Sequence, residues 1–169
     1  MDNMLKKLEE YLYKLLSKRK SGVDDYSCSS FLKNIDEIFQ NPVKNAFLVK
    51  TLGTQLEKFE RKSNLSPKDV CKYTGIPNGL YDRMKNQMSS FDSFDKKTIC
   101  LLIICFGLTE KASKTLLGTT HILLQPTKYS FDAAFEFFVK EWYYTNNTQK
   151  NMNDFYKCCE FAEDYFSHN

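Results

Sequence analysis

The chain has 169 residues, of which 42% are apolar, 27% are charged and 15% are aromatic, and its formal net charge is +3. A chain of this length builds about one domain, and its share of apolar and aromatic side chains excludes a wholly disordered segment. The 6 glycines and 4 prolines are too few for a turn-rich all-β fold, so the composition favours an all-α protein.

The first 45 residues predict two amphipathic helices that form an N-terminal arm. Apolar side chains recur at helical spacing over residues 4–16, and the basic residues 18–20 suit the carboxyl end of a helix. A second apolar stripe covers residues 31–39 and ends before Pro42. Neither helix carries an identifiable chemistry, so we interpret both as core or interface elements.

Residues 46–118 predict a series of short helices separated by tight turns. The apolar pattern places five of them, at residues 47–62, 68–73, 77–85, 96–106 and 109–117. Ser66 and Pro67 are typical of a helix N-cap followed by the first helical turn. Gly75 suits the left-handed conformation that ends a helix. Asp95 and Thr109 are expected to cap the fourth and fifth helices.

The residues around Gly75 have the spacing of a helix-turn-helix. The small side chain of Cys71 permits the two helices to pack closely, and Gly75 permits the sharp turn between them. Ile76 fills the space behind the turn. Tyr81 and Met84 then lie on the side of the second helix that faces the core.

Together with the five-helix pattern, these residues make the segment resemble the lambda-repressor/Cro-like helix-turn-helix family, also called the XRE family. The resemblance implies an all-α fold with a five-helix DNA-binding domain at 46–118, an N-terminal helical arm at 1–45 and a C-terminal helical extension at 119–169. It implies a sequence-specific transcriptional regulator that binds double-stranded DNA as a homodimer.

The resemblance also implies which residues contact DNA, because the helix after the turn lies in the major groove in this family. The residues expected to face the bases are Asn78, Gly79, Asp82 and Arg83. Those expected near the phosphates are Ser66, Lys85 and Asn86. Arg83 would read guanine and Asn78 adenine, each through two hydrogen bonds.

Three residues depart from the family pattern. Pro67 stands where a phosphate-binding glutamine is usual, Gly79 offers no side chain at a base-reading position, and Asp82 places a negative charge on the DNA face. These departures support an alternative function. In it, the helix-turn-helix is only the scaffold of a protein-interaction or inhibitor module, such as an antitoxin-like protein or a phage inhibitor of a CRISPR effector.

The charges and apolar stripes of the chain leave further alternatives open. Residues 47–90 hold eight Lys and Arg against four Asp and Glu, whereas residues 130–169 hold three against seven. A basic middle suits a nucleic-acid face, but ordinary solvated helix surface explains it as well. The two last helices are predicted at residues 130–144 and 151–166. Their apolar stripes, at 131–142 and 155–166, either complete the core or form a dimer seam.

The chain shows no sign of catalysis. It contains no phosphate-binding loop, dinucleotide glycine fingerprint, H-E-x-x-H or G-x-S-x-G motif. Neither histidine has a plausible place as the base for a cysteine or serine nucleophile. We therefore expect a protein that is not an enzyme.

The expected location is the cytoplasm. The amino terminus lacks the apolar stretch of a secretory signal, and the longest apolar run, residues 99–106, is far shorter than the ~20 residues that cross a bilayer. The six cysteines are then expected to be free thiols. They contain no C-x-x-C pair and the chain has only two histidines, so we expect no metal or other cofactor.

Overall fold

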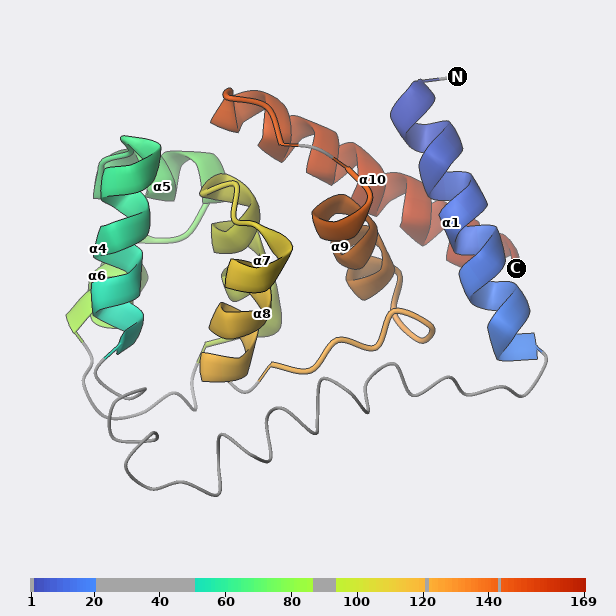
Figure 1. Cartoon of the computed structure of the whole chain (residues 1–169), viewed down its shortest axis with the longest axis horizontal. Helices are drawn as coiled ribbons and strands as arrows, with labels where there is room; N and C mark the ends of the chain where they lie inside the picture. The colour runs from blue at the N-terminus through green and yellow to red at the C-terminus, as the bar shows by residue number, and fades with distance from the viewer. Residues whose placement is uncertain (1, 21–50, 87–93, 121, 143) are drawn as a thin grey trace.

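The computed structural model describes residues 2–20, 51–86, 94–120, 122–142 and 144–169. This part of the chain consists of helices joined by turns, with no strand, which confirms the predicted all-α class (Figure 1). Its helices are α1 (Asn3–Lys20), α4 (Thr51–Ser63), α5 (Pro67–Thr74), α6 (Asn78–Asn86), α7 (Lys96–Cys105), α8 (Glu110–Thr119), α9 (Ser130–Lys140) and α10 (Thr148–His168). The helix predicted at 31–39 lies outside the described residues.

The five short helices predicted in the middle of the chain correspond to α4 to α8, although the predicted start of the first one, residues 47–50, lies outside the described residues. α4 packs against α6, and α5 packs against both α6 and α7 (Figure 1). The predicted caps are confirmed, since Asp95 Oδ1 accepts a hydrogen bond from the Lys97 N–H and Thr109 Oγ1 accepts one from the Ala112 N–H. These caps satisfy backbone donors that α7 and α8 cannot pair internally.

Helix α7 is the centre of the fold. Every residue from Thr98 to Cys105 is buried, as expected for a helix that is apolar on all sides. α5, α8 and α10 all pack against it. The helix therefore links α5 to the C-terminal part of the chain.

The apolar stripes of the terminal helices are buried within the chain. Phe135 and Phe138 of α9 form edge-to-face pairs with Phe155 of α10, with ring centroids 6.3 and 5.6 Å apart. On α1, the buried stripe comprises Met4, Leu8, Leu12 and Leu16, and this helix packs on α10 and α9. One continuous hydrophobic cluster includes side chains from all these elements. Of the two alternatives left open by the sequence, the stripes therefore serve as core.

A buried carboxylate on α9 forms an ion pair with a lysine at the start of α7. Asp132 is fully buried, and its Oδ2 accepts hydrogen bonds from Lys96 Nζ and from the Gln125 N–H, both at 2.7 Å. The Lys96 ammonium also lies 4.9 Å from the centroid of the Tyr129 ring. A buried charge needs such partners, because unpaired ions in an apolar interior are costly.

Helix α9 ends earlier than predicted. The apolar pattern predicts a helix to residue 144, but α9 stops at Lys140 and Glu141 is its C-cap. The Tyr144 ring packs on Phe138, with centroids 5.6 Å apart, and it lies against Gly107. Tyr144 thus reaches the core from outside the helix rather than as part of a longer one.

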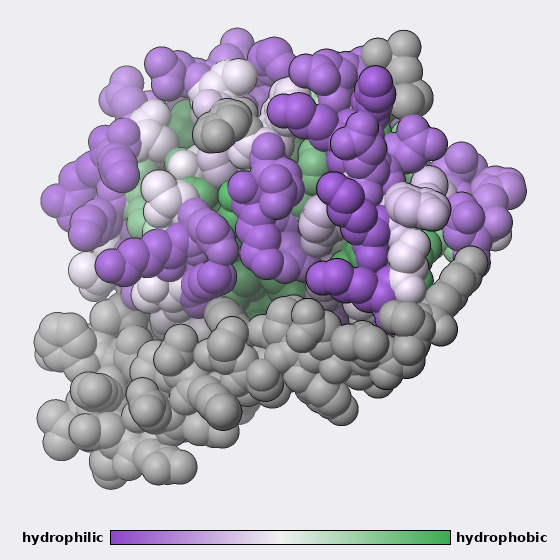
Figure 2. Space-filling model, turned by 45° about the vertical axis from the view of Figure 1, so that its right-hand side comes forward, coloured by the Kyte–Doolittle hydropathy of each residue, from purple (hydrophilic) through white to green (hydrophobic). Residues whose placement is uncertain are grey.

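The outside of the described chain is mainly polar. Figure 2 shows one face on which hydrophilic side chains cover most of the coloured surface, with hydrophobic ones visible between them. No helix among the described residues is both long enough and apolar enough to span a bilayer.

Candidate nucleic-acid interface

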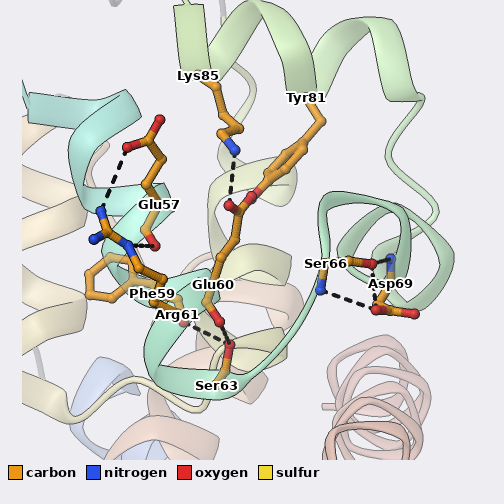
Figure 3. A network of polar contacts seen from close by, with 9 residues as sticks. All are labelled: Glu57, Phe59, Glu60, Arg61, Ser63, Ser66, Asp69, Tyr81 and Lys85. Carbon is orange, nitrogen blue, oxygen red and sulfur yellow. Dashed lines mark hydrogen bonds and ion pairs between the residues drawn. The ribbon is translucent and has the colours of Figure 1, made fainter.

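A reciprocal cap stabilises the start of α5, the helix that precedes the turn to α6. Ser66 Oγ accepts a hydrogen bond from the Asp69 N–H at 3.2 Å, and Asp69 Oδ2 accepts one from the Ser66 N–H at 3.1 Å (Figure 3). Pro67 occupies the first helical turn, where its missing N–H is no loss. The Ser66 hydrogen bonds lower the pKa of the Asp69 carboxyl.

The helix end that follows has the predicted glycine conformation. Gly75 adopts φ 72°, in the left-handed region, and its N–H donates to the Cys71 carbonyl at 2.9 Å. The buried Thr74 hydroxyl donates to the Val70 carbonyl at 2.7 Å and accepts from the Ile76 N–H at 3.3 Å. These bonds fix the short connection from α5 to α6.

The inner face of α6 is held by a buried carboxylate from α4. Glu60 is 8% exposed, and its two oxygens accept hydrogen bonds from the Tyr81 hydroxyl at 2.8 Å and from Lys85 Nζ at 2.9 Å (Figure 3). Tyr81 and Met84 are fully buried, as predicted. Burial, together with the Glu60 hydrogen bond and charge, raises the pKa of Tyr81, so its hydroxyl stays a donor.

A glycine that the sequence analysis did not single out lets α4 and α6 approach closely. A Cβ atom built on Gly53 would lie 2.1 Å from the carbonyl oxygen of Lys85. No larger residue fits there without moving one helix. The signal in the sequence was a glycine within an otherwise helical apolar pattern, which indicates a close backbone contact.

The outer face of α6 carries polar residues that have no partners among the described residues. Asn78, Gly79, Asp82, Arg83 and Asn86 are all exposed. Lys85 is instead half-buried and paired with Glu60. Asp82 and Arg83 are neighbours but do not pair with each other, because adjacent helical side chains diverge by about 100°.

The structure therefore brings five of the seven predicted DNA-contacting residues onto one exposed helix face. The other two, Ser66 and Lys85, have their polar groups engaged within the chain. Of the three residues expected near phosphates, Asn86 alone has a polar side chain that is both exposed and unengaged by the described residues.

Exposed lysines on α4 and α5 offer cations that the resemblance did not assign. Lys58 and Lys62 lie on α4, and Lys68 and Lys72 lie on α5. Residues 51–86 together carry seven Lys and Arg against four Asp and Glu. This excess of positive charge is the part of the basic middle segment that the structure describes.

The thiols of the described residues are poor nucleophiles. Cys71, Cys100, Cys105, Cys158 and Cys159 are free. Burial raises the pKa of Cys105, Cys158 and Cys159 to about 12. Cys28 lies outside the described residues. No group of three or more His, Cys, Asp or Glu in the described ranges is arranged to hold a metal ion.

No protein-family model, curated protein or solved structure matches this chain. The class that the structure itself defines is an all-α protein in which two short helices meet at a glycine turn, and the second helix exposes one polar face.

Proposed function

We propose that this chain is a sequence-specific DNA-binding transcriptional regulator of the lambda-repressor/Cro-like kind, with α6 as its recognition helix. The observation that carries the proposal is the division of α6 into two faces. Tyr81 and Met84 are fully buried, while the polar residues on the opposite side are exposed and unpartnered in the described chain. In this proposal the protein is not an enzyme and needs no cofactor.

The dimensions of the helix support this role. An α-helix with its side chains is about 10–12 Å across, and the major groove of B-DNA is about 12 Å wide. Glu60 and the backbone contact at Gly53 hold α6 rigidly on α4. A helix held in this way presents its outer side chains at defined positions along the groove.

The unpartnered residues have the chemistry for base contacts. The Arg83 guanidinium can donate two hydrogen bonds to guanine N7 and O6, and the Asn78 amide can pair with adenine. Each such contact discriminates against other bases by about 1–3 kcal/mol. Lys68 supplies an exposed cation for the phosphates, with Asn86 as a neutral partner.

The test is a binding titration of the full chain with fluorescent DNA duplexes, including its own upstream region, at several salt concentrations. We expect affinity to fall steeply with salt. Arg83→Ala should remove sequence preference, whereas Lys68→Ala should weaken all sequences alike and reduce the salt slope by about 0.9. Lys157→Ala, an exposed lysine on α10, is the matched control and should change neither property.

The proposal includes a homodimer and a cytoplasmic location. A two-fold symmetric operator is read by two copies of a helix-turn-helix. The stripes on α1, α9 and α10 are used within the chain, so the interface would involve other surfaces. Light scattering after size-exclusion chromatography, with and without DNA, measures the stoichiometry directly.

A second candidate function is a protein-interaction or inhibitor module. The observation that favours it is the engagement of Ser66 and Lys85 within the chain, together with the exposed Asp82 carboxylate. Under this alternative, the chain would pass through a heparin column without retention. It would be recovered from its native host in a stoichiometric complex with one other protein.

A further inference from the structure

Gly79 is a glycine that the fold does not require. It lies in the first turn of α6, a Cβ atom on it would meet nothing within 4 Å, and its φ is not in the left-handed region. Gly75, by contrast, is needed for its positive φ, and Gly53 for its contact with Lys85. Gly118 of α8 is likewise not required by the fold, but it is half-buried, whereas Gly79 is exposed on the polar face of α6. A missing side chain on that face leaves room for a close approach by something outside the chain, at the cost of a weaker helix.

Asp82 lies three residues after Gly79, and therefore on the same side of the helix about one turn away. Its carboxylate is exposed and makes no hydrogen bond or ion pair with the described residues, although its charge contributes to the raised pKa of Cys71. Because phosphates repel a carboxylate, an aspartate that faces DNA has to meet a hydrogen-bond donor on a base edge.

The donors that bases expose in the major groove are the amino groups of cytosine and adenine. Adenine places its N7 acceptor beside its amino group, and this acceptor repels a carboxylate. Cytosine has a C–H group beside its amino group and no such acceptor. The chemistry of Asp82 therefore matches the cytosine N4 amino group best.

An aspartate is short, so it reaches a base edge only when the helix backbone lies deep in the groove. A glycine one turn away on the same side removes the side chain that would hold the backbone off. We propose that Gly79 and Asp82 form a close-approach site that selects a cytosine in the DNA target. This inference rests on the proposed function. It gives one physical reason for two residues that depart from the pattern of the family that the sequence resembles.

The experiment selects preferred sites from a randomised duplex pool with the full wild-type chain and with each variant. We expect the wild type to fix a cytosine at one position, and replacing that base should weaken binding about tenfold or more. Asp82→Ala should lose the preference at that position only. Asp82→Asn should shift it towards adenine, because an amide both donates and accepts.

The glycine is tested against a matched control. Gly79→Ala should weaken binding to the selected site, and Gly79→Gln should weaken it further and reduce the preference for cytosine. Gly118→Ala also adds a Cβ that meets nothing within 4 Å, but on α8, so it should leave DNA binding unchanged. Circular dichroism and urea denaturation of every variant separate loss of binding from loss of fold.

Two negative outcomes are distinguishable. If the wild type selects a sequence but Asp82→Ala keeps the same preference at every position, the cytosine site is overturned while the proposed function stands. If the wild type enriches no sequence and binds no duplex, the proposed function fails, and the cytosine site fails with it.

Discussion

The backbones of α4 and α6 touch where Gly53 faces the carbonyl oxygen of Lys85, at a point where a Cβ atom would be 2.1 Å away. One turn before Lys85 on α6, the Tyr81 hydroxyl donates to Glu60 of α4. The position of the proposed recognition helix is therefore determined by steric fit at one end of this contact and by a buried hydrogen-bond network at the other.

The steric contact predicts that Gly53→Ala destabilises the protein. The added methyl group forces the two backbones apart, and such overpacking costs about 1–3 kcal/mol. Gly118→Ala is the control, because its Cβ meets nothing within 4 Å and helix propensity favours alanine over glycine by roughly 0.5–1 kcal/mol. Urea denaturation of both variants measures the difference. Equal stability of the two would contradict the close contact.

The buried network predicts unequal effects for changes at Tyr81 and at Glu60. Tyr81→Phe removes one hydrogen bond and leaves Glu60 paired with Lys85, so it should cost about 0.5–1.5 kcal/mol. Glu60→Ala removes the acceptor of both bonds and leaves the Tyr81 hydroxyl buried without a partner, so it should cost more.

A double-mutant cycle between Tyr81→Phe and Glu60→Ala tests this assignment. The two changes share one hydrogen bond, so their combined effect should be smaller than the sum of the single effects. Strict additivity of the two free energies of unfolding would show that the hydroxyl and the carboxylate are not coupled.

The cap of α5 predicts a component of stability that depends on pH. The Ser66 hydrogen bonds lower the pKa of Asp69 below its usual value of 3.8. A lowered pKa in the folded state means that the ionised carboxylate stabilises the fold above pH ~4 and that this contribution is lost as the pH falls through the folded pKa. Asp69→Asn should therefore lose less stability than the wild type when the pH falls from about 5 to about 3. The free energy of unfolding in urea, measured for both proteins at the two pH values, tests this.

The serine of the same cap has its own expected effect. Ser66→Ala should lower the free energy of unfolding by about 0.5–2 kcal/mol, while Ser66→Asp should retain most of the stability because aspartate is also a good N-cap. If alanine and aspartate at this position gave the same urea midpoint, the hydroxyl would not act as the cap.

The buried thiols predict slow alkylation of the folded chain. Cys105 and Cys158 are buried, and burial raises the pKa of each thiol to about 12 from its usual value of 9.0. The raised pKa lowers the thiolate fraction at pH 8 by about a thousandfold. Peptide mapping after iodoacetamide treatment should show these two unlabelled in native buffer and labelled in urea. Rapid labelling of Cys105 in the native state would contradict its burial.

Local signals predicted the elements around the turn well. Ser66, Pro67 and Gly75 each have one dominant physical role at a helix end, and the structure shows all three in those roles. The apolar spacing likewise identified Tyr81 and Met84 as buried. Local sequence was sufficient because the role of each of these residues depends on residues close to it in the chain.

Contacts between distant residues were not predicted. Lys85 is separated from Glu60 by 25 residues, so helical spacing alone could not show that its ammonium would be used inside the chain. The charge of Lys85 looked like that of any exposed lysine. The resemblance assigned it to a phosphate, whereas the tertiary fold pairs it with a carboxylate. The ion pair between Asp132 and Lys96, which are 36 residues apart, was not predicted for the same reason.

The burial of α7 on all sides has a practical consequence for dissecting the molecule. A fragment that stopped at residue 118 would lack α10, which packs on α7 and α5, and would expose part of the buried apolar surface of α7 to water. Such a fragment would tend to aggregate. The segment that holds α5 and α6 is therefore best studied within the full chain, because α7 needs its C-terminal neighbour for cover.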